Sequence, residues 1–197
     1  MKILITGGAG YLGSVITGKL LNSGYKVTVI DKLIFNQVSL LSYTSNPNFK
    51  FIHGDVRNEK LLEKLCDEND VIIPLTAIVG FPACAAEPEL ADEINFKQIF
   101  NIVKFTSGKN KKILYPNTNS GYGIGVNQTE CTEESPLSPI SIYGKTKCDA
   151  ENFLKSNTNA IIFRLATVFG VSPRMRTDLL VNDFTYKAIT ENTHEER

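Results

Sequence analysis

The chain has 197 residues, 42% hydrophobic and 21% charged, with 21 basic residues against 21 acidic ones. That length is ample for one domain with a hydrophobic core, and the net charge of zero argues against a protein that binds the phosphate backbone of nucleic acid. The apolar runs are about strand length, far short of a membrane span. Because Met1-Lys2 leads directly into an apolar strand pattern, we expect no secretory leader. Four scattered cysteines without a Cys-x-x-Cys pair are typical of reduced thiols and predict no metal site. We therefore expect a soluble, cytoplasmic protein.

Short apolar runs alternate with helix-length amphipathic stretches along the chain. The runs predict buried strands at Lys2–Thr6, Lys26–Ile30, Phe49–His53, Asp70–Leu75, Lys112–Tyr115 and Ala160–Ala166. Apolar residues at helical spacing predict helices at Tyr11–Asn22, Glu59–Cys66, Pro88–Thr106, from an N-cap at Ser138 to about Ser156, and at Asp178–Thr190. This alternation predicts an α/β fold, a doubly wound (Rossmann-like), mostly parallel sheet with helices on both faces. We expect this dinucleotide-binding domain over residues 1–190, with 191–197 as a frayed tail.

Two loops are longer than the connections typical of such folds, Thr76–Glu87 and Asn117–Leu137. Both follow predicted strands at their carboxyl ends. Because ligands of open α/β sheets bind at that edge, we expect both loops to border the site.

A glycine-rich turn follows the first strand and opens a helix. Gly7, Gly10 and Gly13 form a Gly-x-x-Gly-x-x-Gly pattern, which suits a tight turn, close approach of a pyrophosphate and close packing of helix on strand. Asp31 closes the second strand, where a carboxylate accepts from adenosine ribose hydroxyls and repels a 2′-phosphate. The pattern predicts NAD rather than NADP, although the adjacent Lys32 could partly offset that repulsion. The alternative is a glycine-rich turn without a ligand.

Tyr143 and Lys147 are four residues apart near the start of a predicted helix, so they share one face. A free tyrosine, with a pKa of about 10, is a poor base at neutral pH. A lysine ammonium beside it, together with a cationic nicotinamide ring, would favour the phenolate and make it a usable acid/base. The alternative is an ordinary solvated helix face.

Several motifs together resemble one known family. They are the Thr6–Gly13 opening, Asp31, His53-Gly54-Asp55-Val56-Arg57, Leu75-Thr76-Ala77, Asn95, Thr118 with Tyr122-Gly123, Tyr143-x-x-x-Lys147, and Arg164-Leu165 with Phe169-Gly170. From Met1 to about Ile189 the sequence resembles the extended short-chain dehydrogenase/reductases, of the NAD-dependent epimerase/dehydratase group that acts on nucleotide sugars. The resemblance implies NAD contacts from Gly7, Gly10, Tyr11, Leu12, Gly13, Asp31, Asp55, Val56, Leu75, Ala77, Asn95, Tyr143 and Lys147. Asp55 would contact the adenine, and Val56 would pack on it.

The resemblance also implies a reaction. Thr118 would hydrogen-bond the reacting sugar oxygen, Tyr143 would be the acid/base, and Lys147 would hold the nicotinamide ribose. A sugar hydroxyl would be oxidised to a keto intermediate and the hydride returned to the opposite face. Such activity would serve polysaccharide biosynthesis. On the substrate side we expect Asn119 beside Thr118, and Arg174 with Arg176, whose guanidiniums suit a diphosphate; the alternative for the arginines is a solvated loop paired with Asp178 or Asp183.

Departures from the family pattern narrow this expectation. Asn119-Ser120 follows Thr118 where dehydratases of the family carry an Asp-Glu pair, and an amide cannot replace a titrating carboxylate. Epimerisation or oxidoreduction is therefore preferred, and dehydration remains an alternative. Family members continue into a smaller C-terminal domain that grips the nucleotide part of the substrate, and we expect this chain to lack it. A non-catalytic NAD-binding module is thus a second hypothesis. The resemblance also makes a homodimer plausible, through the helix that carries Tyr143 and the helix before it.

Overall fold

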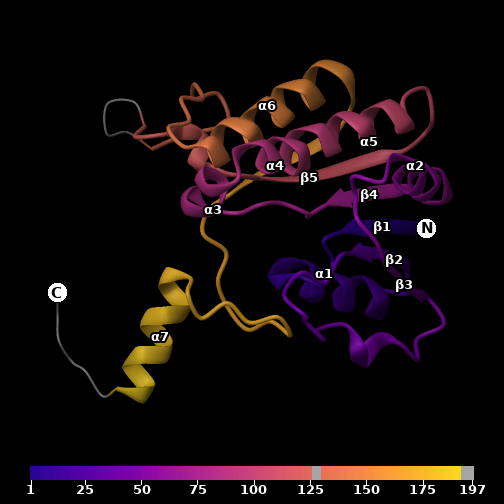
Figure 1. Ribbon diagram of the computed structural model, residues 1–197, viewed down its shortest axis with the longest axis horizontal. Helices are drawn as coiled ribbons and strands as arrows, with labels where there is room; N and C mark the ends of the chain where they lie inside the picture. Colours follow the sequence, from indigo (N-terminus) through magenta and orange to yellow (C-terminus); the bar gives the residue numbers. More distant parts are fainter. Residues whose placement is uncertain (126–129, 192–197) are drawn as a thin grey trace.

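The computed structural model describes residues 1–125 and 130–191, so most of the predicted tail, 192–197, lies outside the described residues. Six parallel strands form one sheet in the order β3-β2-β1-β4-β5-β6 (Figure 1). The strands are β1 (Lys2–Thr6), β2 (Lys26–Asp31), β3 (Phe49–His53), β4 (Val71–Pro74), β5 (Lys112–Thr118) and β6 (Ile161–Leu165). The helices are α1 (Tyr11–Asn22), α2 (Glu59–Glu68), α3 (Phe81–Ala86), α4 (Pro88–Asp92), α5 (Gln98–Thr106), α6 (Ile142–Asn157) and α7 (Leu180–Thr190).

Both faces of the sheet are covered, because alternate residues of each strand point to opposite sides. On β1, Leu4 packs in one buried cluster with Leu62 of α2 and Ile102 of α5. Its neighbour Ile5 packs in a second cluster with Leu21 near the end of α1. Figure 1 shows α2, α4, α5 and α6 on one side of the sheet and α1 on the other. The predicted doubly wound parallel fold is thus confirmed.

The strand order reverses at β1, which pairs with β2 on one side and β4 on the other. Ile5 lies opposite Val29 of β2 and Ile73 of β4. The carboxyl ends of these three strands therefore meet at one edge, the topological switch point at which open α/β sheets bind ligands.

Four predicted helices have different bounds in the structure. Helix α2 ends at Glu68 rather than Cys66, and α7 begins at Leu180 rather than Asp178; the other two differ more. The predicted helix at Pro88–Thr106 is α4, a π-helical segment η2 (Glu93–Lys97), and α5. The buried Asn95 within η2 bonds to residues outside its helix, a tertiary constraint that helical spacing does not reveal. The helix expected from Ser138 begins at Ile142, because Ser141 is the N-cap, its Oγ accepting from the amide of Gly144 at 3.0 Å.

Both predicted loops contain regular structure, and residues 126–129 of the second lie outside the described residues. Helix α3 lies within Thr76–Glu87. Strand β5 continues to Thr118 although Pro116 lacks an N–H donor. The register of β5 on β4 ends at Ile113, whereas on β6 it continues to Thr118. Past Ile113 one edge of β5 is therefore unpaired, so the proline is tolerated there. The 3-10 turn η3 (Asn119–Tyr122) follows directly.

Within the described ranges, no helix combines the length and the apolar character that crossing a bilayer requires.

Candidate active site

The glycine-rich turn lies tightly between β1, β4 and α1. A Cβ on Gly13 would come within 2.6 Å of Gly8 Cα, and one on Gly7, which has a φ of +70°, would come within 2.7 Å of the backbone N of Thr76. Helix α1 begins after Gly10, which provides no side-chain cap for its first-turn N–H groups. The turn is thus a backbone cradle at a helix N-terminus, as binding of a pyrophosphate requires.

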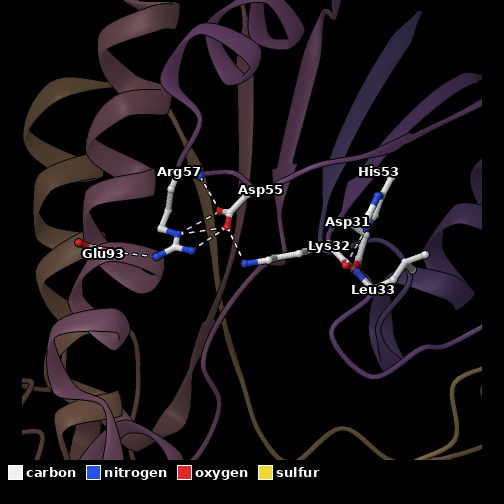
Figure 2. A network of polar contacts seen from close by, with 7 residues as sticks. All are labelled: Asp31, Lys32, Leu33, His53, Asp55, Arg57 and Glu93. Atoms are coloured by element: carbon white, nitrogen blue, oxygen red, sulfur yellow. Dashed lines mark hydrogen bonds and ion pairs between the residues drawn. The ribbon is translucent and has the colours of Figure 1, made fainter.

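Asp31 faces this cradle from the end of β2. Its Oδ2 accepts from the amide of Ala9 at 3.0 Å, and its Oδ1 accepts from the amide of Leu33 at 2.8 Å. The neighbouring Lys32 turns to Asp55, with its Nζ 3.1 Å from Oδ2 (Figure 2). The lysine charge is therefore paired with another carboxylate rather than with Asp31.

Asp55 lies after β3 in a network of charges. Arg57 donates to it from Nε and from Nη2, the latter at 2.8 Å, and reaches Glu93 at 3.2 Å with its other nitrogen (Figure 2). The hydrogen bond from Arg57 holds the pKa of Asp55 well below its usual range, against the opposing effect of partial burial. The adjacent Val56 is 4% exposed and packs in the core, so Asp55 is the more accessible of the two.

Leu75 and Ala77 lie half-buried just after β4. Their segment is fixed by Asn95, which is 2% exposed: its amide oxygen accepts from the amide of Ile78 at 2.8 Å, and its Nδ2 donates to the carbonyl of Ile78 at 3.0 Å. The same Nδ2 lies 3.3 Å from Oγ1 of Thr146 on α6. Asn95 thus joins the segment after β4 to the helix that carries Tyr143 and Lys147.

Lys147 is buried against the end of β5. Its Nζ donates to the carbonyl of Pro116 at 2.8 Å and lies 4.0 Å from the ring centroid of Tyr115. Burial lowers the pKa of Lys147 to about 7. Burial raises the pKa of Tyr143, and the nearby Cys84 raises it further. The prediction that Lys147 and a cationic nicotinamide together favour the phenolate stays a prediction. In the protein alone, the ammonium group of Lys147 is directed at a carbonyl and is itself desolvated.

Thr118 ends β5 at the same edge of the sheet. Its Oγ1 accepts from the amide of Ser120 at 3.1 Å and donates to Oγ of Ser120 at 3.0 Å. Lys147 binds the residue two positions before Thr118, so α6 and the threonine are joined through the backbone of β5. The exposed Asn119 opens η3 and borders a cavity of about 780 Å³.

The two arginines after β6 differ in their surroundings. Arg176 pairs with Asp178, at 2.7 Å from Nε to Oδ1. This pairing was the alternative to a role in binding the substrate diphosphate. Arg174 lies over the ring of Phe35, 5.1 Å from its centroid, and donates to the carbonyl of Met175. Only Arg174 is thus without a carboxylate partner among the described contacts of this pair.

Sequence reasoning missed the residues that fasten this segment to the glycine-rich turn. Tyr11 Oη donates to the carbonyl of Gly170 at 2.6 Å and accepts from Nδ2 of Asn182 at 3.0 Å. Ser172 is buried and donates to the carbonyl of Tyr11 at 2.7 Å. No local pattern marks the contacts of Ser172 and Asn182 with Tyr11, since each spans more than 150 residues of sequence.

Sequence reasoning also did not predict that Asn117, Glu151 and Arg164 form a cluster. Glu151 follows Lys147 by one helical turn, and that spacing was the available signal.

The family match covers the chain from residue 3 to residue 195 and is described as the NAD dependent epimerase/dehydratase family. The chain belongs to this family. Among curated relatives it is 29% identical to the low-salt glycan biosynthesis protein Agl12 of Haloferax volcanii, over 98% of this chain and 64% of that protein. It is 30% identical to UDP-glucose 4-epimerase 2 of Oryza sativa, over 78% of this chain and 40% of that protein. The chain therefore spans about half the length of such relatives.

Solved structures agree with this membership. UDP-glucose 4-epimerase from Thermotoga maritima matches with a TM-score of 0.83 and 27% identity, over 95% of this chain and 62% of that one. UDP-glucuronic acid 4-epimerase from Bacillus cereus, solved with NAD, matches with a TM-score of 0.82 and 28% identity, over 97% and 63%. The similarity covers the Rossmann-like part of those enzymes and leaves more than a third of each unmatched.

Proposed function

We propose that this chain binds NAD and carries the catalytic residues of a nucleotide-sugar epimerase or oxidoreductase that acts at a sugar hydroxyl through a keto intermediate. The observation that supports this most is the convergence of the glycine cradle, Asp31, Thr118 and α6 at the carboxyl edge of one parallel sheet. The UDP-sugar 4-epimerases among the relatives support a nucleotide sugar as the substrate class.

The described residues fit NAD. Gly7, Gly10 and Gly13, with Tyr11 and Leu12, would hold the pyrophosphate at the start of α1. Asp31 would accept from the adenosine ribose, and the pairing of Lys32 with Asp55 leaves its charge free to repel a 2′-phosphate. Bound NAD would supply the acceptor and donor of hydride.

The roles that we propose around the adenine and the nicotinamide come from the family resemblance, and the arrangement of the side chains supports them. Asp55 would meet the adenine, with Val56 forming the buried wall behind it. Leu75 and Ala77 would border the dinucleotide, and Asn95 would act mainly by fixing that segment, since its amide is used by protein groups.

In the reaction Thr118 would donate to the reacting sugar oxygen and Tyr143 would take or return its proton. Because burial holds Tyr143 as the phenol in the protein alone, a cation brought to its side is needed to favour the phenolate. Lys147 would hold the ribose of the cofactor, from a position fixed by the Pro116 carbonyl.

On the substrate side we propose Thr118, Asn119 and Arg174, the arginine pairing with the diphosphate. The weaker proposal is Arg176, because Asp178 already engages it. Epimerisation is preferred over dehydration, since Asn119 and Ser120 offer no titrating carboxylate next to Thr118. A role in glycan synthesis is supported by the similarity to Agl12.

The direct test uses Tyr143→Phe. The purified chain is mixed with NAD⁺ and a panel of nucleotide sugars, and the product isomers are followed. Loss of general acid–base catalysis should lower turnover by about 10²–10⁴-fold, while the chain should still bind NAD⁺. If the wild type binds NAD⁺ but converts none of the sugars, the catalytic part of the proposal is wrong for this chain.

That outcome would favour the second candidate, a non-catalytic NAD-binding module. The observation behind it is that the chain spans about half the length of the epimerases it resembles. In such a module Tyr143→Phe has no turnover to remove.

We also propose a homodimer through α5 and α6. Phe100 of α5, Phe153 of α6 and Phe96 of the adjoining η2 form an aromatic cluster, with ring centroids 5.2 Å apart for Phe100 and Phe153. Phe100 is 45% exposed, so the cluster offers apolar surface for a second copy.

A further inference from the structure

Glu151 is a carboxylate with no solvent exposure, one turn beyond Lys147 on α6. It accepts hydrogen bonds from Nε and Nη2 of Arg164 on β6, the latter at 2.6 Å, from Lys155 at 2.6 Å, and from Nδ2 of Asn117 on β5. Burial opposes its ionisation, but these hydrogen bonds outweigh burial and lower the pKa of Glu151 to about 2. The carboxylate is therefore charged and fixed at neutral pH.

Two residues of one helix face thus hold two consecutive residues of β5. Lys147 binds the carbonyl of Pro116, and Glu151 binds the side chain of Asn117. Thr118 is the next residue, and among its described contacts the Oγ1 meets only Ser120. The position of the Thr118 hydroxyl therefore depends on the end of β5, which Lys147 and Glu151 of α6 hold by hydrogen bonds.

Arg164 extends this contact to the turn after Thr118. Its side chain is 10% exposed, and its Nη1 donates to Oη of Tyr122 at 3.0 Å and to the carbonyl of Glu133 at 3.1 Å. The guanidinium also lies 5.1 Å from the centroid of the Tyr122 ring. The residues before and after Thr118 are therefore joined to the same buried ion pair.

We propose that Glu151, held by Arg164, is a positioning residue for Thr118: it fixes the end of β5 and the turn η3 relative to α6, and so aligns the Thr118 hydroxyl with Tyr143. The inference rests on the proposed function for its effect on turnover, but its effect on the structure around Thr118 is independent of any reaction.

The first readout is therefore structural. In Glu151→Gln, which keeps the size of the side chain and removes its charge, the amide of Ser120 should lose protection from hydrogen exchange measured by NMR, because its acceptor is Thr118 Oγ1. The amides of β1 should keep theirs. Glu68→Gln is the matched control, since Glu68 pairs on the surface of α2 with Lys50 at 3.6 Å.

The second readout is turnover. Glu151→Gln should lower kcat by about 10- to 100-fold, the cost of a misplaced catalytic group, with the dissociation constant for NAD⁺ unchanged. In a Thr118→Ala background the same substitution should cause no further loss, because both changes act through one hydroxyl. If the losses of kcat caused by Glu151→Gln and by Thr118→Ala multiply in the double variant, the proposal is overturned. Glu151 would then have a general structural role that does not act through Thr118.

If Glu151→Gln does not fold, Arg164→Lys tests the same proposal. It keeps the charge, loses the paired hydrogen bonds, and should weaken Ser120 protection in the same way. Unchanged protection of Ser120 in the folded variants would overturn the proposal even if turnover fell. A wild type without turnover would count against the proposed function alone, because the exchange measurement would still decide the role of Glu151.

Discussion

Lys147 combines a charge with almost complete burial, at 6% exposure. The Pro116 carbonyl and the Tyr115 ring compensate its ammonium group only in part, so burial lowers its pKa from 10.5 to about 7. Between these two values the unfolded chain binds a proton that the folded chain does not. Burial of Lys147 therefore does not lower the free energy of unfolding above about pH 10.5, where the lysine is neutral in both states. As the pH falls from 10.5 through 7, the unfolded chain gains a proton first and the free energy of unfolding decreases.

We predict that Lys147→Met removes this dependence. The gain in free energy of unfolding of the variant over the wild type should be smallest near pH 10 and should increase as the pH falls to about 7. Urea denaturation without NAD at a series of pH values measures it. Lys145→Met, on an exposed position of the same helix, is the control and should leave the pH profile unchanged. A constant difference between Lys147→Met and the wild type would contradict the account.

At the scale of the element, α6 has to start at the right residue to bring Tyr143 and Lys147 to the end of β5. Ser138 and Ser141 are both suitable N-caps by composition. In the structure the backbone N–H of Ser138 donates to the carbonyl of Gly121 at 2.8 Å, and Ser141 caps the helix. The choice between them depends on a contact with η3 that local sequence does not contain.

We predict that Ser141→Ala lowers the free energy of unfolding by about 1 kcal/mol and also lowers turnover, because the first turn of α6 carries Tyr143. Asn58→Ala removes the equivalent cap of α2, where Asn58 Oδ1 accepts from the amide of Leu61 at 3.1 Å. It should cost similar stability and leave turnover unchanged. Chemical denaturation and steady-state kinetics on both variants measure the two effects. Equal losses of turnover would show that stability alone explains them.

Features that depend on local sequence were predicted, and features that depend on contacts between elements were not. The bounds of β1 were predicted to the residue, because Ile3, Leu4 and Ile5 form a short apolar run that is buried in the core. The glycine cradle and Asp31 were predicted because their spacing is local. The π-helical turn at Asn95 and the buried pair of Glu151 with Arg164 were not predicted, since each depends on partners from other elements.

At the scale of the whole molecule, the described residues form a six-stranded doubly wound sheet, and the chain covers 64% of the length of Agl12 and 40% of that of UDP-glucose 4-epimerase 2. The outer surface of α5 and α6 lies on the side of the sheet away from α1 (Figure 1). A second copy bound there would leave the switch point of the sheet, and hence the proposed cofactor site, free.

We predict that Phe100→Glu weakens this proposed dimer by about 10-fold or more, since it puts a charge at the centre of an apolar contact. Sedimentation equilibrium over a concentration series measures the change. Phe35→Glu, an exposed aromatic far from α5 in the sequence, should have no effect on association. A wild type that stays monomeric at all concentrations would refute the dimer without affecting the proposed site.

The central claim is that this chain forms a folded NAD site with Asp31 at the ribose. A thermal unfolding scan with NAD⁺, with NADP⁺ and with neither tests it most directly. At about 100 times its dissociation constant, NAD⁺ should add roughly 2.7 kcal/mol and raise the midpoint by roughly 5–11 °C, whereas NADP⁺ should raise it little. No shift with either dinucleotide, or an equal shift with both, would contradict the account.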